Sequence, residues 1–479
     1  MSDKTRESDQ DRTAVQPHFY EQFIEKQHRI FVNRNLRMSS IRWVGFDMDH
    51  TLALYNRNFI EALAFDLSLQ ALVREKGYPR ALLDTRYDPD FGIRGLVVDK
   101  EEGNILKMDR FHYVAVAYHG FKALDKETRK GLYTSEPMQL SSSRFWSSDT
   151  LFGLPEIALY ASVVEALEAM GWPPGLTYRQ AFTDIRTCVD LVHKDGSLKS
   201  VFRERLGECF LRDPRLVATL DKFRGEGKRL FLLTNSDYAY TDWVLRWVMN
   251  DGERDRSWWS FFDLIVTDSH KPGFFQEGIP WKRLEVADHS VPCFSGGNVR
   301  LLEEKLGARG DEVLYVGDHI FGDILRSKKS SGWRTVMIVE ELEHEIRVAL
   351  GSEELRAVID QLEMENSDLL ARVARLRRRQ ERAAAVGAPE PRGGFSAEEK
   401  ELGARLTRNM LRINELEEEI RRRYNPWWGS LCKVDGELSR FGDQMRDFAC
   451  LYTARVSNFL YYPPGRYFLS PVEFLPHEI

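Results

Sequence analysis

The sequence predicts an α/β fold built around a parallel β-sheet with crossover helices, and three observations support this prediction. Short apolar runs of strand length alternate mostly with helical patterns. Each run ends at an acidic or hydroxyl side chain. The first and second runs are separated by about 170 residues, far more than one crossover helix needs, so an inserted domain is expected. The runs lie at 41–46, 230–233, 264–267, 313–316 and 335–339.

Composition limits the class of protein before any motif is considered. The 479 residues are 43% hydrophobic and 30% charged, enough for at least one full core. The net charge of -6 argues against binding nucleic acid through a basic surface. The 5 cysteines lack CxxC spacing, so neither a disulfide framework nor a zinc site is indicated, and no apolar stretch is long enough to span a membrane. We expect a soluble, cytoplasmic protein with no nucleic-acid or membrane partner.

The chain is predicted to divide into several parts. The beginning of the N-terminal arm, residues 1–16, is polar and expected to be disordered. The inserted cap is expected to open with a hairpin whose turn is centred near Gly103 and to be helical from about residue 150 onward. The parts are an N-terminal arm at 1–40, a core at 41–60 and 226–345, an α+β cap at 61–225, a helical hairpin at 350–424 and a C-terminal segment at 425–479 that packs back on the core.

The helical hairpin is predicted from apolar residues that alternate spacings of four and three along two arms. Pro389 and two glycines interrupt the pattern between the arms. If the two arms pack antiparallel, Asn366 on the first arm lies opposite Asn409 on the second, each within the apolar stripe of its helix. We expect their amides to pair and fix the register, because an unpaired buried amide costs roughly 1–3 kcal/mol. The alternative is that each amide tolerates a partly wet seam.

Two acidic pairs follow predicted strands directly. Asp47 and Asp49 follow the first run, and Asp318 and Asp323 follow the fourth. Because ligands of parallel sheets bind at the carboxyl ends of the strands, these side chains are expected to converge. Carboxylate oxygens are ligands that Mg²⁺ prefers, and such a set suits phosphoryl transfer. We predict a Mg²⁺ site formed by Asp47, the main-chain carbonyl of Asp49 and Asp318, with Asp323 as a further ligand or a neighbouring carboxylate.

The first acidic pair also supplies the reactive groups that hydrolysis of a phosphate monoester requires. Asp47 is ionised at neutral pH and is predicted to attack phosphorus, forming an aspartyl-phosphate. Asp49 is predicted to donate a proton to the leaving oxygen and then to accept one from water. The pair therefore predicts a nucleophile followed by a general acid and base.

Donors for the phosphate charge follow two further strands. Thr234, Asn235 and Ser236 come after the second run and would hold phosphoryl oxygens through hydroxyl and main-chain N–H groups. Lys271, after the third run, would place a positive charge beside Asp47 and the phosphate. Each signal alone more often marks a turn, a cap or a solvated charge, but their joint order at strand ends favours catalysis.

These residues lie within longer motifs. The motifs occupy 45–52, 234–242, 261–263, 271–275, 295–297, 317–325, 459–464 and 475–478. The set resembles the cytosolic purine 5'-nucleotidases of the haloacid dehalogenase superfamily, from about residue 17 to the end of the chain. The resemblance implies a Rossmann-like core with an inserted cap, Mg²⁺ as the cofactor, and hydrolysis of the purine nucleoside monophosphates IMP and GMP. It also implies phosphate transfer to nucleosides and assembly as a homo-oligomer, either a dimer or a tetramer.

Specificity is expected to come from the cap. Arg186, Asp190 and His193 are spaced four and three, so on a helix they form one polar stripe that can both donate to and accept from a 6-oxopurine edge. The residues alone favour a simpler interpretation, an exposed Arg–Asp pair that contributes about 0.3–0.5 kcal/mol. The resemblance instead implies that this stripe and Lys199 contact the base and phosphate, and that Phe121 stacks on the base. Without the resemblance, Phe121 would be assigned to the core.

Two alternatives to a purine nucleotidase stay open. One is a phosphatase of the same chemistry that acts on another phosphate ester. The other is a non-catalytic scaffold that assembles through the helical hairpin. The scaffold is disfavoured because every position of the predicted catalytic set is present.

Overall fold

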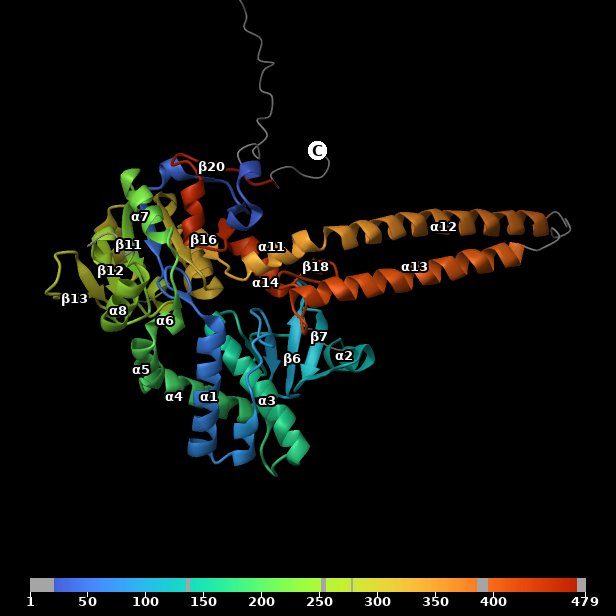
Figure 1. The fold of residues 1–479 in the computed structure, drawn as a ribbon, viewed down its shortest axis with the longest axis horizontal. Coiled ribbons are helices and arrows are strands. Elements are labelled where there is room, and N and C mark those ends of the chain that lie inside the picture. The colour runs from blue at the N-terminus through green and yellow to red at the C-terminus, as the bar shows by residue number, and fades with distance from the viewer. Residues whose placement is uncertain (1–20, 135–137, 251–255, 277–278, 386–394, 472–479) are drawn as a thin grey trace, which may run out of the picture.

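The computed structural model describes residues 21–134, 138–250, 256–276, 279–385 and 395–471. Within these ranges a core built on one large sheet carries a cap on one side and a long helical arm that projects away from both (Figure 1). The predicted disorder at 1–16 and the motif at 475–478 lie outside the described residues.

The core sheet has nine strands in the described part of the chain. In spatial order they are β1 (Phe31–Val32), β19 (Leu451–Thr453), β16 (Arg334–Ile338), β15 (Val313–Gly317), β3 (Trp43–Phe46), β11 (Arg229–Leu233), β12 (Leu264–Thr267), β14 (Cys293–Ser295) and β13 (Lys282–Leu284). Only the edge strands β1 and β13 run antiparallel to their neighbours. All of the predicted runs are strands of this sheet, so the predicted α/β fold class is confirmed.

The strand register brings the carboxyl ends of the central strands level. Phe46 of β3 pairs with Leu232 of β11 on one side and Val316 of β15 on the other. Gly45 is required in this position, because a Cβ atom there would lie 2.1 Å from the ring of Phe231. The residues that follow β3, β11 and β15 therefore emerge at one edge of the sheet.

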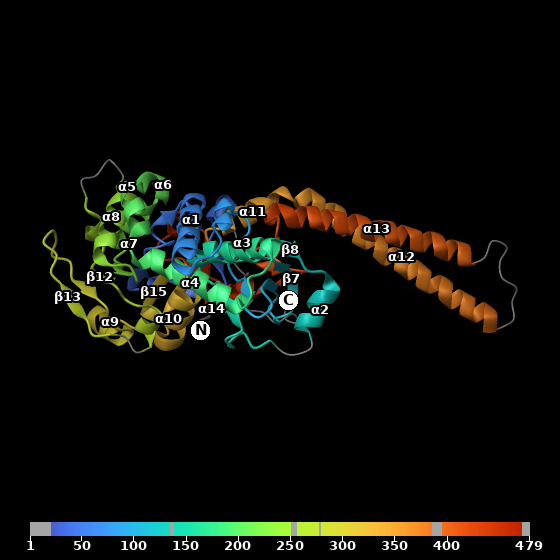
Figure 2. The same cartoon turned by 90° about the horizontal axis from the view of Figure 1, so that it is seen from below.

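The cap combines an antiparallel sheet with a layer of helices. Its strands are β8 (Lys122–Ala123), β7 (Val114–His119), β6 (Asn104–Met108), β5 (Val97–Asp99) and β9 (Phe145–Ser147), in that spatial order. β5 and β6 form the predicted hairpin, and Gly103 has a φ of 73°, in the left-handed region that glycine favours. Helices α1 (Arg57–Lys76), α3 (Leu154–Met170) and α4 (Tyr178–Lys194) pack on one another. Figure 2 shows these helices from below.

Short elements complete the core and the connections. The helices are α2 (Lys126–Tyr133), α5 (Ser197–Glu204), α6 (Leu206–Cys209), α7 (Leu216–Gly225), α8 (Tyr238–Val248), α9 (Val299–Leu306), α10 (Arg326–Ser331) and α14 (Arg440–Phe448). The short strands pair as β4 (Leu54–Tyr55) with β10 (Phe210–Leu211), β2 (Leu36–Arg37) with β20 (Tyr467–Phe468), and β17 (Lys433–Val434) with β18 (Glu437–Leu438).

The arm is a pair of long helices that follow α11 (Leu342–Gly351). Helices α12 (Glu353–Ala385) and α13 (Phe395–Tyr424) run side by side away from the rest of the molecule in both views (Figures 1 and 2). Asn409 Nδ2 donates to Asn366 Oδ1 at 3.0 Å, so the predicted pairing of the two amides is confirmed. None of the helices in the described ranges is both long and apolar enough to cross a membrane.

The C-terminal segment holds the core and the cap together. β19 lies between β1 and β16 and completes one side of the core sheet. From the cap, the buried ammonium of Lys107 donates to the main-chain oxygens of Trp428, Ser430 and Lys433 at 2.7, 2.5 and 3.0 Å. The sequence did not predict β19, because a three-residue strand carries too short a pattern to recognise.

Candidate functional site

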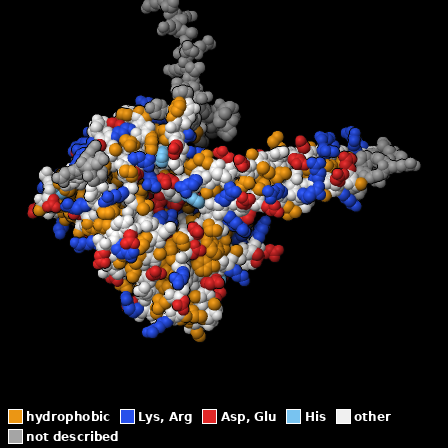
Figure 3. All heavy atoms as spheres, in the orientation of Figure 1, with side chains coloured by type: hydrophobic (Ala, Val, Ile, Leu, Met, Phe, Trp, Pro, Cys, Tyr) orange, Lys and Arg blue, Asp and Glu red, His pale blue; other side chains and the backbone are white. Residues whose placement is uncertain are grey.

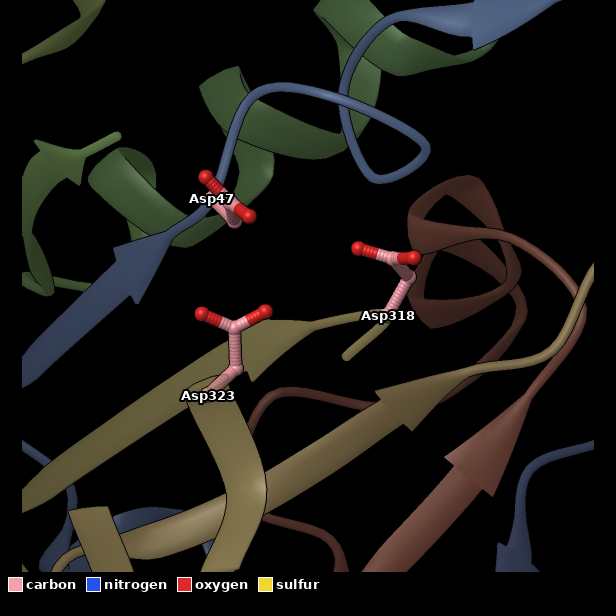
Figure 4. Close-up of side chains that lie close together, drawn as sticks. All are labelled: Asp47, Asp318 and Asp323. Carbon is pink, nitrogen blue, oxygen red and sulfur yellow. The ribbon is translucent and has the colours of Figure 1, made fainter. Parts of the chain in front are cut away.

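Three carboxylates meet at the carboxyl edge of the core sheet (Figure 4). Asp47 follows β3, Asp318 follows β15, and Asp323 lies in the π-helical turn Ile320–Leu325. All three are buried, and their ligand oxygens lie within 4.8 Å of one another. Gly317 makes the approach possible, because a Cβ atom there would lie 2.6 Å from the Asp323 side chain. The structure thus brings together three of the four predicted carboxylates.

The chemistry of this group fits Mg²⁺, which prefers carboxylate oxygens. Asp318 Oδ2 is buried and accepts no hydrogen bond within the described ranges, so it is free to face a cation. Burial raises the pKa of Asp318 to about 6 and raises the pKa of Asp47 well above its ordinary value. A bound cation would favour the ionised forms and reverse these shifts.

Lys271 lies against two of the carboxylates. Its Nζ is 2.9 Å from Asp47 Oδ1 and donates to Asp323 Oδ1 at 2.7 Å. Burial by itself lowers the pKa of Lys271, but the charges of Asp323 and Asp47 outweigh burial, so the pKa is raised. The ammonium therefore remains charged beside Asp47, as the sequence predicted for this residue.

Asn235 holds the loop that carries Lys271. Its Oδ1 accepts from the Lys271 N–H at 2.6 Å and from Ser269 Oγ at 2.8 Å, and its Nδ2 donates to the Lys271 carbonyl at 3.0 Å. The donors that Asn235 could still offer to phosphate are its main-chain N–H and the second N–H of Nδ2. Thr234 is fully buried, and its Oγ1 accepts from the N–H of Ser236 at 3.1 Å.

The side chain of Asp49 stands apart from the three grouped carboxylates. Its Oδ1 accepts from Tyr55 at 2.5 Å, and its Oδ2 accepts from Ser236 Oγ at 2.7 Å. Tyr55 is itself hydrogen-bonded to Tyr240, hydroxyl to hydroxyl, at 2.7 Å. A contact between Asp49 and a metal through its main-chain carbonyl stays a prediction. Sequence reasoning missed both tyrosines, since a tyrosine next to an apolar run is an ordinary core pattern.

A pocket opens beside Asp49 at the junction of the core and the cap. Its empty volume is about 750 Å³, which includes space open to solvent. Core and cap residues both line it: Asp49, His50, Tyr55, Arg57, Ile60, Glu61, Ala64, Leu151, Phe152, Pro155, His193, Leu198, Lys199, Phe202, Ser236 and Tyr240. A ligand in this pocket would contact both parts of the chain.

Two of the predicted specificity residues line the pocket. His193 Nδ1 lies 2.8 Å from the carbonyl oxygen of Val189, so the neutral ring carries its proton on Nδ1 and leaves Nε2 as an acceptor. Lys199 Nζ donates to Asp237 Oδ2 at 2.5 Å. These contacts orient both side chains before any ligand is bound.

The other two predicted specificity residues, Arg186 and Asp190, are not among the lining residues. Arg186 is paired with Glu156 at 2.6 Å and with Asp190 at 3.2 Å. Glu156 was not predicted. Burial raises its pKa to about 7 against the opposing charge of Arg186, and its second oxygen, Oε1, has no partner within the described ranges.

Phe121 is not brought to the pocket. Its ring packs against Phe91 and Trp427, with ring centroids 4.8 and 5.6 Å apart. The aromatic ring that does line the pocket is Phe152, which is 40% exposed and lies 4.7 Å from the ring of His50. In the sequence, Pro155 predicts that a helix begins shortly after Phe152, because proline is typical of the first turn of a helix. The sequence does not distinguish Phe152 itself from a core residue.

Comparison with known proteins places the chain in a family. The model of the 5' nucleotidase family matches residues 30–479. A 5'-nucleotidase domain-containing protein of Dictyostelium discoideum is 28% identical over 470 residues, which is 94% of this chain and 74% of that protein. The 5'-nucleotidase domain-containing protein 2 of Rattus norvegicus is 28% identical over 344 residues, 67% of this chain and 60% of that protein, so the chain matches less than two thirds of the rat protein.

Among solved structures, a haloacid dehalogenase-like family hydrolase of Streptococcus pneumoniae has a TM-score of 0.25 and 13% identity, covering 63% of this chain and 86% of that one. The family match extends over both the carboxylate group and the pocket. The resemblance seen in the sequence motifs is thereby confirmed. The chain belongs to the 5' nucleotidase family and is, by that membership, a phosphoric monoester hydrolase.

Proposed function

We propose that this chain is a Mg²⁺-dependent 5'-nucleotidase that hydrolyses the purine nucleoside 5'-monophosphates IMP and GMP to nucleoside and phosphate. One observation carries the proposal. The buried group of Asp47, Asp318 and Asp323 stands at the sheet edge, and Asp49, two residues from Asp47, lines a pocket between the core and the cap. A phosphate at Asp47 with its nucleoside in the pocket would use both features at once.

The carboxylates of Asp47, Asp318 and Asp323 would hold Mg²⁺, with the main-chain carbonyl of Asp49 as a further ligand. When bound, the cation neutralises negative charge on the phosphate. Lys271 adds a fixed positive charge beside Asp47. The hydroxyl of Thr234, at the end of β11, would donate to a phosphoryl oxygen, and Ser236 would do so on releasing Asp49 Oδ2 or Thr234 Oγ1, to which its Oγ and its N–H now donate.

The proposed reaction has two steps on the same aspartate. In the first, an Asp47 oxygen forms a bond to phosphorus while the bond from phosphorus to the ribose oxygen breaks, and Asp49 gives its proton to that oxygen. In the second, Asp49 takes a proton from water, whose oxygen attacks phosphorus and releases phosphate and free Asp47. A nucleoside hydroxyl in place of water would give phosphate transfer instead of hydrolysis.

Preference for a purine would come from the cap. The ring of Phe152 offers an aromatic face for stacking, which a larger base covers better. His193 Nε2 can accept from the base. Arg186 and Asp190, about two turns and one turn before His193 on α4, can donate and accept, but they do not line the pocket and would have to turn from each other to reach the base. A 6-oxopurine carries a matching donor and acceptor on its edge.

We also propose that the enzyme acts in the cytoplasm as a homo-oligomer. The five cysteines are all free thiols, which suits a reducing compartment. The resemblance to the purine 5'-nucleotidases supports the oligomer.

The decisive experiment is a phosphate-release panel. IMP, GMP, AMP, CMP, UMP, ribose 5-phosphate and p-nitrophenyl phosphate are each assayed with Mg²⁺ and with chelator, and inosine is added to report transfer. We expect Mg²⁺-dependent release that is fastest with IMP and GMP and is abolished in Asp47→Asn. Asp263→Asn is the matched control, because Asp263 accepts from Leu230 at the opposite edge of the same sheet.

The alternatives predict different outcomes in this panel. Equal turnover of all the esters would remove the purine proposal and leave a general phosphatase. Absence of Mg²⁺-dependent release, or release that survives in Asp47→Asn, would favour the scaffold.

A further inference from the structure

Helix α12 has a face that is opposite its seam with α13 and is covered by nothing in the described part of the chain. The residues on this face recur at spacings of three and four, which places them along one side of a helix, and all of them are exposed. They are Glu353, Glu354, Ala357, Asp360, Gln361, Met364, Ser367, Asp368, Ala371, Ala374, Arg375, Arg378, Glu381 and Arg382. We call this set the outer face of α12. In Figure 1 the helix lies along the free side of the projecting arm.

Charge is divided between the two ends of the outer face. The half near the core carries acidic residues, and the half near the tip carries arginines, with Glu381 as the one exception. The acidic residues are Glu353, Glu354, Asp360 and Asp368, and the arginines are Arg375, Arg378 and Arg382. Figure 3 shows basic side chains gathered toward the tip of the arm.

These charges have no partners in the part of the chain that the structure describes. None of the seven residues forms an ion pair or a hydrogen bond through its side chain in the described ranges. The neighbouring arginines that point toward α13 do find partners, since Arg372 pairs with Glu398 and Arg377 with Glu399. The seven unpaired charges of the outer face therefore lie on the side of α12 that faces away from the hairpin, and Glu363 and Arg379, beside the seam, also have no partner in the described ranges.

The middle of the outer face is apolar and small. Met364 is 73% exposed, although methionine is one of the residue types most often buried. Ser367, Ala371 and Ala374 follow it along the same side and leave room for a second helix to approach closely. An exposed methionine beside alanines forms a matching bump and hollow when such a face meets its own copy.

A second α12 turned end for end matches most of the outer face, and the mismatch is Glu354, which falls opposite Glu381. If Met364 lies opposite Ala371 of the second copy, the same register sets Asp360 opposite Arg375 and Glu353 opposite Arg382. Twofold symmetry repeats every contact, so each ion pair forms twice. A parallel arrangement would place like charges together, which disfavours it.

We propose that two copies of this chain associate through the outer faces of α12, antiparallel, about an axis between Ser367 and Asp368. The partner is a second copy rather than a nucleic acid or an acidic membrane. Either of those would engage only the arginines near the tip and would be repelled by Glu353, Glu354 and Asp360. The interface does not depend on the reaction or on the substrate proposed above.

The test is a charge swap in the full-length protein, with the dimer dissociation constant measured by analytical ultracentrifugation at low and high salt. Asp360→Arg and Arg375→Asp each replace two ion pairs by two like-charge contacts, so each should raise the dissociation constant by about tenfold or more. The chain that carries both changes should recover most of the affinity, because the reversed charges again face each other. Arg408→Asp, the same change of charge on the exposed surface of α13, should leave the dissociation constant unchanged.

A second measurement fixes the register. Met364→Cys combined with Ala371→Cys should form disulfides between copies on mild oxidation, and Met364→Cys alone should form far fewer. Circular dichroism and phosphate release are recorded for every variant, so that loss of folding is distinguished from loss of association.

Several outcomes would overturn the proposal. A wild-type chain that stays monomeric at high concentration has no such interface. If neither single change alters the dissociation constant, the dimer forms through another surface. The same conclusion follows if the double change does not restore the affinity. A monomer that binds single-stranded RNA or anionic vesicles, and loses that binding in Arg375→Asp but not in Asp360→Arg, would assign the arginines to an anionic partner instead.

Discussion

Arg94 donates a hydrogen bond from Nη1 to the main-chain carbonyl oxygen of Asp318, at 3.0 Å. The same guanidinium donates twice to the carboxylate of Glu341, at 2.8 and 2.5 Å, and lies over the ring of Phe441. Arg94 belongs to the cap, whereas Asp318 and Glu341 belong to the core, and Phe441 belongs to the C-terminal segment. Three parts of the chain therefore meet directly behind one carboxylate of the predicted Mg²⁺ site.

Arg94→Lys should weaken Mg²⁺ binding. Lysine cannot reproduce the hydrogen bonds to Asp318 and Glu341 together, and loss of a partner behind a metal ligand typically costs 10- to 100-fold in affinity, so we expect an increase of about tenfold in the dissociation constant. Isothermal titration calorimetry with Mg²⁺, in the absence of substrate, measures this dissociation constant.

The matched control for Arg94 is Arg440→Lys. Arg440 is also a buried arginine and donates to Asp149 at 2.8 Å, away from the three grouped carboxylates. Both variants should lose stability, but only Arg94→Lys should lose affinity for Mg²⁺. Equal losses of affinity would show that Arg94 acts only on overall stability.

Mg²⁺ should stabilise the folded chain, and Asp318 should carry much of this effect. A ligand at 100 times its dissociation constant stabilises the state that binds it by about 2.7 kcal/mol. In chelator, Asp318→Asn should be at least as stable as the wild type, because it removes a buried carboxylate whose Oδ2 has no partner in the described ranges. Thermal unfolding with Mg²⁺ and with chelator measures both effects. An equal rise in the melting temperature of the two proteins would place the cation elsewhere.

Glu156 should make stability depend on pH. Burial raises its pKa to about 7, above its ordinary value, so the folded chain binds a proton that the unfolded chain has lost between about pH 4.5 and 7. The contribution of Glu156 to stability is therefore present at low pH and falls as the pH rises through this window. Glu156→Gln has no such titration. Between pH 4.5 and pH 8, the free energy of unfolding of the wild type should therefore fall by roughly 3 kcal/mol relative to that of Glu156→Gln. Urea unfolding across this range measures the difference, and a constant offset would contradict the shifted pKa.

Phe152, not Phe121, should govern the affinity for the base. Stacking of a base on an aromatic side chain is worth about 1–3 kcal/mol, so Phe152→Ala should raise KM for IMP by roughly tenfold or more and leave KM for p-nitrophenyl phosphate nearly unchanged. Phe121→Ala should lower the melting temperature, because the ring packs on Phe91 and Trp427, without changing the ratio of the two KM values. The reverse result would return the role to Phe121. Steady-state kinetics with both esters decides between the two rings.

The sequence was sufficient to predict the carboxylate group, because Asp47 and Asp318 are each tied to the end of an apolar run. Once two runs are parallel neighbours, the positions that follow them must lie together. Lys271 was predicted on the same ground. The pairing of Asn366 with Asn409 was predictable for a similar reason. The heptad spacing and the position of the turn determine which residues of the two antiparallel helices lie opposite each other.

The wall of the pocket was not predictable in the same way. Phe121 and Phe152 both follow polar turns in the cap, and their neighbours in sequence do not show which ring faces the core. Their positions depend on how the cap helices dock, which is a set of contacts between distant segments. Arg94 was missed for the same reason, because the residues it holds lie more than 200 positions later in the chain.

The placement of β19 has a consequence for synthesis on the ribosome. Phe31 pairs with Tyr452, and the N–H of Ile30 donates to the hydroxyl of Tyr462, 432 positions later. After β16 is made and until β19 emerges, the outer edge of β16 has no neighbour, and an open strand edge is a site for wrong pairing. The helical arm between β16 and β19 is made of local contacts and can form during this interval. The nascent chain must therefore keep an unfinished sheet soluble until Leu451–Thr453 has emerged, so its need for chaperones is greatest while the segment between β16 and β19 is being made.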